Sequence, residues 1–385
     1  MPRLLLSCSV FATTLAAIHA GPLRPATQPA TQPASRLPPV LAEEVREAVR
    51  RGLAYLESRQ QQDGGWTADY GPAVTALVGQ AFVQDDRYGP RHAVVRRAMA
   101  AILRHEQSDG GFYERRQNLA NYQTSVVLMF LASIDDAEHK PRIAKAQAFL
   151  KRLQYDREES VDPADAWYGG AGYNERKRPD LSNTQMMLEA LHQSGLRGDD
   201  PVYQRALAFV SRCQMLDATN DQPFADGATD GGFIYTPAGG GESKANDERA
   251  EGTVPLRSYG SMTYAGFKSM LYAEVSRDDP RVQACLRWIK RHWTLERNPN
   301  MPEPRSQEGL YYYYHVFARA LRAYGEPIIV DEAGRPHDWR EELCRKLISL
   351  QRPDGSWAND RDRWLEGDPN YVTALAILSL QTAAH

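Results

Sequence analysis

Four tyrosines and a histidine follow one another at positions 311 to 315, and His315 is the side chain of this run best suited to acid–base chemistry. If the run is helical, four consecutive residues cannot share one face, because a helix turns once every ~3.6 residues. One or two of the tyrosines, with Tyr314 as a candidate, should therefore reach an inner cavity while the others pack between helices. His315 is a catalytic candidate whose structural alternative is a buried histidine with a hydrogen-bond partner.

Two acidic residues, Asp180 and Glu308, stand where helices are expected to begin. A carboxylate at the start of a helix commonly caps the free backbone N–H groups, and this is the structural interpretation of both residues. Asp180 is the second catalytic candidate. The paired acids Asp135 and Asp136 fall at the end of an expected helix, where they indicate a surface turn.

The composition is that of an ordinary globular chain. Its 385 residues carry a net charge of −3, with 42% hydrophobic and 25% charged residues. Nothing is basic enough to suggest a nucleic-acid partner. We therefore do not expect a nucleic-acid partner.

The first twenty residues predict a signal peptide, because Arg3 precedes an apolar run from Leu4 to Ile18 and Ala20 offers a small residue at a cleavage site. The run is too short to span a membrane, and no later segment is longer. Cys8 stands too near the start for a lipoprotein anchor. The expected destination is the periplasm or the extracellular space, and residues 21–40, with six prolines, predict an extended linker.

Three cysteines remain after the leader, Cys213, Cys285 and Cys344. An odd number without close spacing predicts neither a disulfide framework nor a cysteine-based zinc site. We expect them to be small core residues on helices.

Beyond the linker, the chain alternates two kinds of helix. From Val45 to Leu56 the apolar residues follow the spacing of one helical face, which predicts an outer helix with a wet side. From Val126 to Leu131 every residue is apolar, which predicts an inner helix buried all round. Six such pairs follow one another. Outer helices are expected near residues 42–61, 91–107, 141–155, 201–215, 280–293 and 339–351, and inner helices are expected to begin near Pro72, Asn121, Leu181, Ser258, Tyr311 and Asn370.

The turns between the helices of a pair also repeat. Asp63-Gly64-Gly65-Trp66 returns as Asp109-Gly110-Gly111-Phe112 and as Asp354-Gly355-Ser356-Trp357, which indicates a glycine that ends the outer helix and an aromatic residue that fixes the turn. Five of the inner helices carry a threonine near the start, namely Thr75, Thr124, Thr184, Thr263 and Thr373. Six pairs that close into a ring share one core, so we predict a single all-α domain over residues 41–385, an α6/α6 toroid of inner and outer helix rings.

The repeated unit resembles the QW repeat of squalene-hopene and oxidosqualene cyclases. Arg51-Gly52, Tyr55-Leu56, Gln60, Gly64 and Trp66 match the repeat, and partial matches end at Phe112, Gln154, Gln214 and Trp357. The resemblance covers all six units, and implies the toroid fold of terpenoid cyclases and protein prenyltransferases, with a central apolar cavity. Fold does not determine function.

The catalytic motifs of that superfamily are missing from the matching positions. Class II cyclases use Asp-x-Asp-Asp-Thr at the start of an inner helix, and the nearest match here, Asp180 to Thr184, keeps only the first aspartate. Protein prenyltransferases hold zinc with Asp, Cys and His, where this chain has Arg257, Tyr259 and Val372. The Cys-Gly-Glu-Gln thioester run of other relatives is also absent. We therefore expect no metal and no cofactor.

The turns of the third and fourth units are long, with 30 residues from Gln154 to Thr184 and 49 from Gln214 to Thr263. Long loops inside a compact domain are usually functional or disordered, and the glycine-rich, charged segment 237–252 is expected to be either a mobile flap or disordered. Trp167, Tyr168 and Tyr173 of the third turn are expected to face the mouth of the ring. The full set of expected cavity residues is Tyr122, Gln123, Trp167, Tyr168, Asn183, Tyr259, Tyr264, Tyr314, His315 and Tyr371.

Two functions stay open. The first is a secreted, monomeric toroid that binds a hydrophobic ligand, an isoprenoid or a lipid, or else a protein partner, without cyclase or zinc chemistry. The second is an enzyme, either a divergent terpenoid-modifying enzyme or a toroid that acts on polysaccharides, as some secreted pectate lyases do. A lyase would need a base such as Arg257 or Lys268 beside a calcium site, for which Asp226, Asp230 and Glu242 are the available carboxylates.

Overall fold

The computed structural model describes residues 37–134, 136–158, 160–175, 177–246 and 255–385. The predicted signal peptide and residues 21–36 of the predicted linker lie outside the described residues, and so do residues 247–252 of the predicted flap. The first helix begins at Pro39, inside the stretch that was expected to be linker.

Twelve α-helices alternate along the described chain between an outer and an inner position. The outer helices are α1 Pro39–Ser58, α3 Ala93–Leu103, α5 Lys140–Arg152, α7 Pro201–Cys213, α9 Pro280–Arg291 and α11 Trp339–Leu350. The inner helices are α2 Pro72–Val83, α4 Ala120–Ile134, α6 Leu181–Gln193, α8 Gly260–Tyr272, α10 Leu310–Tyr324 and α12 Pro369–Ala384. Each predicted inner-helix start lies within two residues of the observed one.

Short elements complete the chain. Strand β1 (Ile328–Val330) pairs with β2 (Pro336–Asp338) in an antiparallel hairpin, with Ile329 opposite His337. One-turn 3₁₀ segments occur at Ala68–Tyr70, Arg115–Gln117, Ala137–His139, Asp217–Thr219, Pro223–Ala225, Glu303–Arg305 and Arg363–Leu365. Across the described residues, none of the helices has the length and apolar character needed to cross a bilayer.

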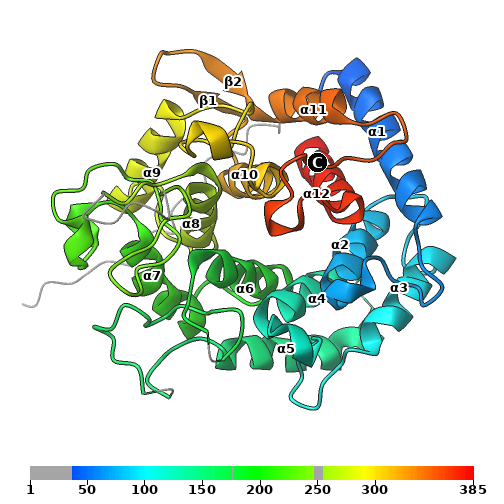
Figure 1. Cartoon of the computed structure of the whole chain (residues 1–385), viewed down its shortest axis with the longest axis horizontal. Coiled ribbons are helices and arrows are strands. Elements are labelled where there is room, and N and C mark those ends of the chain that lie inside the picture. Colours follow the sequence, from blue (N-terminus) through cyan, green and yellow to red (C-terminus); the bar gives the residue numbers. More distant parts are fainter. Residues whose placement is uncertain (1–36, 135, 159, 176, 247–254) are drawn as a thin grey trace, which may run out of the picture. The chain divides into compact units, whose positions relative to one another are not determined.

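The inner helices close a ring. Each of them contacts the next along the chain, from α2 through α4, α6, α8 and α10 to α12, and α12 in turn contacts α2 (Figure 1). The outer helices pack against the outside of this ring, and α1 contacts both α11 and α12. The predicted fold class, an all-α toroid of two helix rings, is confirmed.

The burial pattern explains why each helix takes its position. Helix α1 buries one face, from Leu41 and Val45 to Leu53 and Leu56, while its charged side stays exposed. Helix α4 is buried all round its central turns, from Val126 to Leu131. The outer helices thus have one apolar stripe to cover, and the inner helices need neighbours on every side.

The repeated threonines anchor the turns. The hydroxyl oxygen of Thr75 accepts a hydrogen bond from the backbone N–H of Trp66 at 3.0 Å, and that of Thr373 accepts from Trp357 N–H at 3.0 Å. The same bond joins Thr124 to Phe112, Thr184 to Ala171 and Thr263 to Phe233. Each threonine therefore ties the turn of its pair to the inner helix that follows.

The glutamines after the outer helices join neighbouring pairs. Gln60 Nε2 donates to Gly64 O in its own turn at 2.9 Å and to Val94 O of α3 at 3.0 Å. Gln154 and Gln214 make the same pair of hydrogen bonds, one within their own turn and one to α7 or α9, respectively. Gln351 Nε2 donates to Gly355 O and to Ala48 O of α1, both at 2.9 Å, so the last pair is linked to the first.

The three cysteines Cys213, Cys285 and Cys344 are free and buried on helices, as expected. Burial raises the pKa of the Cys344 thiol to about 12, which keeps it protonated and inert as a nucleophile.

Candidate functional site

A pocket of about 290 Å³ opens where the inner helices begin. It lies at the mouth of the ring, and every inner helix or the residues just before it contribute to its wall. The lining residues are Tyr70, Ala73, Val74, Leu119, Tyr122, Tyr173, Ser182, Asn183, Tyr235, Lys244, Tyr259, Ser261, Met262, Tyr312, Trp364, Leu365 and Tyr371. Eight of these seventeen side chains are aromatic, and seven of the eight are tyrosines, so the surface is apolar with hydroxyl groups set into it.

Helix α6 holds the hydroxyl of the pocket residue Tyr312 in place. The hydroxyl of Tyr312 lies 3.1 Å from Ser182 Oγ and accepts from Gln185 Nε2 at 3.0 Å. The hydroxyls of Tyr122 and Tyr371 lie close enough together to affect each other's pKa. Burial raises the pKa of Tyr122 to about 12, so these groups act as neutral hydrogen-bonding groups and not as phenolates.

Asp180 lies behind the pocket wall and caps helix α6. Its carboxylate accepts from Asn183 N and Asn183 Nδ2, both at 2.8 Å, and the hydroxyl of Tyr235 lies near enough to lower its pKa. Burial raises the pKa of Asp180 to about 6, despite these hydrogen bonds and the charge of Lys244. Asp180 does not line the pocket itself, and its link to the pocket wall is the hydrogen bond from Asn183 Nδ2.

Lys244 brings a cation to the rim of the pocket from the long fourth turn. Its ammonium lies 4.7 Å from the centre of the Tyr235 ring and is paired with Glu242, which also pairs with Arg178. The cation is thus held at the wall by one ring and one carboxylate.

The segment before α12 is strained where it meets the pocket. Trp364 and Leu365 both have a left-handed backbone, with φ of 57° and 69°, which side chains other than glycine rarely adopt. Trp364 remains 40% exposed, and the guanidinium of Arg363 lies 4.7 Å from the centre of its ring.

Glu366 follows this strained segment and lies at the start of α10. Glu366 Oε1 accepts from Tyr312 N at 2.7 Å, and Oε2 accepts from Asn359 Nδ2 at 2.7 Å. The residue is fully buried, and burial raises the pKa of its carboxyl to about 7. Helix α10, which starts with the tyrosine run, is therefore capped by Glu366, a carboxyl group from the turn of the next helix pair.

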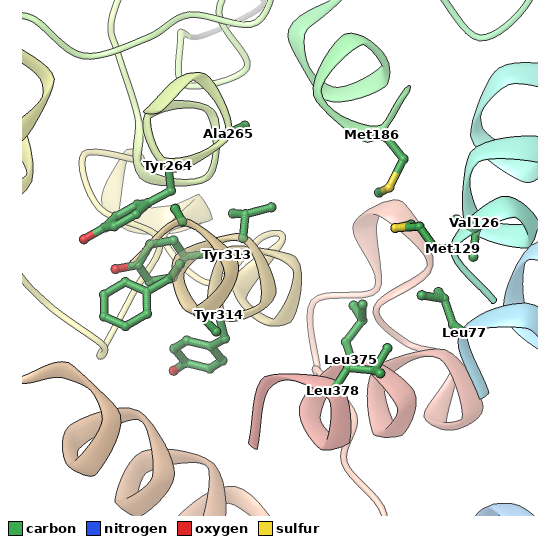
Figure 2. Close-up of a cluster of buried hydrophobic side chains, with 14 of the residues drawn as sticks. Leu77, Val126, Met129, Met186, Tyr264, Ala265, Tyr313, Tyr314, Leu375 and Leu378 are labelled. Atoms are coloured by element: carbon green, nitrogen blue, oxygen red, sulfur yellow. The ribbon is translucent and has the colours of Figure 1, made fainter. Parts of the chain in front are cut away.

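Directly beneath the mouth, the interior of the ring is filled by apolar side chains. Leu77, Met129, Met186 and Leu375, from four different inner helices, are buried and point toward one another (Figure 2). These side chains limit how deeply a ligand can enter from the mouth.

Of the residues predicted from the sequence, the structure brings Tyr122, Asn183, Tyr259 and Tyr371 together in the pocket, and Tyr173 with them. Gln123 lies behind the wall, where it accepts from Glu114 N and donates to Tyr70 O. Trp167 and Tyr168 lie outside the lining, and Trp167 packs edge-on against Tyr155 at 5.1 Å between ring centres.

Three further candidates lie deeper in the helix packing. Tyr264 packs against Tyr313 and Phe317, and Tyr314 donates its hydroxyl to Leu295 O at 2.6 Å, so both lie between helices and outside the pocket lining (Figure 2). His315 is 3% exposed and lies below the mouth, and burial lowers its pKa to about 3.

The residues of the lyase alternative do not meet. Lys268 is fully buried in an ion pair with Glu189, and Arg257 is exposed in the segment before α8. Asp226 is exposed, Asp230 accepts from Gly232 N, and Glu242 is engaged by two cations. Within the described segments, no three His, Cys, Asp or Glu side chains are grouped so that they could hold a metal ion.

Sequence reasoning missed Tyr235, Lys244, Tyr312 and Trp364. Tyr312 was part of the tyrosine run, but the face that would reach the ring interior could not be assigned. Tyr235 follows the buried turn residue Phe233 by two positions. Residues two apart in an extended segment point to the same side, and this spacing was the available signal that Tyr235 also points inward. Nothing in the sequence indicates the left-handed backbone of Trp364.

Fold and site together define an α/α toroid with a closed inner ring and an aromatic pocket at its mouth. No protein-family model matches the chain, and no curated protein matches it by sequence. Among solved structures, the type II terpene cyclase MstE from Scytonema is similar, with a TM-score of 0.56 and 15% identity over 89% of this chain and 98% of that one.

Two other toroids are similar to nearly the same degree. A D-mannose isomerase matches with a TM-score of 0.53 and 11% identity over 87% of this chain and 96% of its own. A polysaccharide lyase matches with a TM-score of 0.53 and 10% identity over 89% and 97%. At these identities the likeness shows a terpenoid cyclase-like toroid fold, which the three proteins use for different chemistry.

Proposed function

We propose that the chain binds a small, largely apolar ligand, an isoprenoid or one end of a lipid, in the pocket at the mouth of the ring. The observation that carries the proposal is the convergence of eight aromatic side chains from all parts of the ring on one pocket. Aromatic walls with a few hydroxyl groups fit a hydrocarbon body that carries one or two polar groups.

The size of the pocket restricts the ligand further. Its volume of about 290 Å³ is at the lower end of the range for ligand pockets, which is roughly 300–1,000 Å³. Because Leu77, Met129, Met186 and Leu375 fill the interior beneath, a long chain would have only one end inside.

The first test is native mass spectrometry of the protein purified from its own host, with extraction and identification of anything bound. In parallel, the purified protein is titrated with farnesol, palmitic acid and a mannose disaccharide, and binding is followed by thermal shift. We expect saturable stabilisation by farnesol or palmitic acid. Stabilisation by the disaccharide alone, or an empty protein that none of the three stabilises, would contradict the proposal and direct attention to the surface of the long third and fourth turns.

Two variants locate the binding. Trp364→Ala removes a partly exposed wall of the pocket, and we expect at least about tenfold weaker binding, since a buried aromatic contact contributes roughly 1.5 kcal/mol. Trp167→Ala is the matched control, because Trp167 is a tryptophan of the third turn that does not line the pocket. Equal losses in the two variants would place the ligand elsewhere.

A second candidate function, acid–base catalysis on the bound ligand, is favoured by Asp180. A carboxyl group whose pKa is raised to about 6 and which accepts hydrogen bonds from the pocket residue Asn183 can hold a proton near neutral pH. Incubation of the wild type and of Asp180→Asn with the identified ligand tests this, because conversion to a product of altered mass or structure should depend on the carboxyl group.

We further propose that the protein is exported through its first twenty residues and acts as a monomer in the periplasm or outside the cell. Cell fractionation with N-terminal sequencing checks the export, with Gly21 as the expected first residue of the mature chain. Recovery of the intact leader in the cytoplasm would contradict it. Light scattering of the purified protein checks the oligomeric state.

A further inference from the structure

A cluster of charged side chains lies inside the ring, away from the mouth pocket. It consists of Glu189 on α6, Lys268 on α8, and His315 and Arg319 on α10. Glu189 stands eight residues after the start of α6, so the cluster lies about 12 Å below the mouth. None of the four residues lines the pocket there.

The cluster holds more positive than negative charge. Lys268 pairs with Glu189, both with side chains that are at most 1% exposed. Gln193 Nε2 donates to Glu189 Oε1 at 3.0 Å, whereas Arg319 Nε stands 3.7 Å from the same oxygen, too far for a hydrogen bond. One carboxylate thus faces two cations, and it already accepts two closer donors.

Further cations lie near Arg319. The charges of Arg340 and Arg319 lower the pKa of Arg322, after the larger effect of burial. Burial lowers the pKa of His315 to about 3, so this ring is neutral at pH 7. Glu189 stays ionised, because the cations outweigh the opposing effect of burial and lower its pKa to about 2.

Two donor-capable nitrogens in the cluster, Arg319 Nε and His315 Nδ1, have no hydrogen-bond partner within the described part of the chain. Buried polar atoms without a partner are rare in folded proteins, and each suggests a water or an ion that satisfies it. His315 is 3% exposed, so bulk solvent does not reach its ring freely. The Arg319 side chain is 15% exposed, which leaves a route from solvent to the cluster.

The negative ends of the inner-helix dipoles do not account for the extra cation. The dipole acts within the last turn of a helix, and Arg319 stands five residues before the end of α10 at Tyr324. A second way to remove the excess positive charge is the loss of a proton from Lys268. Burial does lower the pKa of Lys268.

We propose that Lys268, Arg319 and His315 form a binding site for a small monovalent anion, a halide or a carboxylate, beside the ion pair of Glu189. The anion accepts from the Arg319 guanidinium, from a free N–H of the Lys268 ammonium and from a ring nitrogen of His315. Its charge offsets the second cation and keeps Lys268 protonated.

Thermal unfolding at pH 7.5 and constant ionic strength tests the site. Sodium gluconate, an anion too large for the cluster, is replaced stepwise by sodium chloride, and in a second series by sodium formate. We expect a saturable rise in Tm of about 2 °C at a tenfold excess over Kd, in one or both series. A chloride effect without a formate effect identifies a halide site, and the reverse identifies a carboxylate site. Equal curves in all three salts would overturn the proposal.

Variants separate the site from general salt effects. Arg319→Met is expected to lose the anion-dependent rise, and Arg319→Lys to keep it with weaker affinity. Arg96→Met, which removes an exposed arginine of α3, is the matched control and should behave as the wild type. A rise that persists unchanged in Arg319→Met would contradict the assignment.

Crystals of the wild-type protein soaked in sodium bromide give a test that needs no variant. An anomalous peak in contact with the Arg319 guanidinium and Lys268 Nζ is the expected result when halide is the ligand. When only formate stabilises the protein, the corresponding expectation is carboxylate density at the same place. Peaks confined to the outer surface would overturn the proposal even if Arg319→Met failed to fold.

Discussion

At the scale of single residues, two opposing effects act on carboxyl groups at the starts of the inner helices. The helix N-terminus favours their charged form, whereas burial favours the neutral form. Asp368 caps the start of α12 by accepting from Tyr371 N at 2.8 Å. Glu366 is fully buried, and for this carboxyl the effect of burial is stronger, since its pKa is raised to about 7.

Replacement of Glu366 by glutamine should therefore change how stability depends on pH. The folded protein keeps a proton on Glu366 up to about pH 7, whereas the unfolded chain loses it near its ordinary pKa of 4.5, so the native state binds more protons between these values. The contribution of Glu366 to the free energy of unfolding should fall by up to about 3 kcal/mol across this window and then level off. Thermal and urea unfolding from pH 5 to 8 measures this fall as the difference between the wild type and Glu366→Gln.

Glu138→Gln is the control, because Glu138 is exposed at the surface. It should follow the wild-type curve at every pH. A constant offset between wild type and Glu366→Gln from pH 5 to 8 would mean that the pKa of Glu366 is close to its ordinary value in the folded protein.

At the scale of elements, the ring depends on turns that fit closely against the next outer helix. Gly355 has a φ of +90°, and a Cβ at this position would stand 2.6 Å from the carbonyl oxygen of Arg51 on α1. This turn is where the last helix pair meets the first, beside the double hydrogen bond of Gln351. The glycine is thus required both by its backbone angle and by the closeness of α1.

Gly355→Ala should weaken ring closure beyond the cost of the backbone angle alone. Gly334, in the turn of the β1–β2 hairpin, has a φ of +80°, and a Cβ there would have no atom of the described residues within 4 Å beyond its chain neighbours. Gly334→Ala therefore carries the same backbone strain without the contact. We expect Gly355→Ala to lower the free energy of unfolding by about 2 kcal/mol more than Gly334→Ala does, measured by urea unfolding. Equal losses would show that α1 moves aside without cost.

The elements were largely predictable from the sequence, and the site was predictable only in part. Helix positions follow from apolar spacing and from the glycine and aromatic turns, signals that are local and repeated six times. The contents of the pocket depend on rotation about helix axes and on long turns. Tyr312 and Tyr314 are two residues apart in the same run, yet one reaches the pocket and the other bonds Leu295 O between helices. Lys244 reaches the pocket from a turn for which no periodic pattern exists.

At the scale of the whole molecule, the interior of the ring is divided along its depth. Tyrosines and Trp364 form the mouth pocket, apolar side chains such as Leu77 and Met186 lie beneath it, and the Glu189–Lys268 pair with Arg319 lies deeper still. Because the middle layer is apolar, a ligand at the mouth and an ion at the charged cluster should bind without direct contact. Their mutual influence would have to pass through α6, α8 and α10, which contribute to both sites.

Ring closure also has a consequence for chain connectivity. Every outer helix leads to the mouth and every inner helix leads away from it, so Pro39 at the start of α1 and Ala384 at the end of α12 lie on the same side of the ring, on helices in contact. A circularly permuted chain of residues 37–385, joined by a short linker and opened between Ala273 and Asp279, should therefore fold to the same ring with a Tm close to that of the unpermuted chain. The folded ring would then not depend on which helix pair comes first in the sequence, nor on the order in which the six pairs are synthesised.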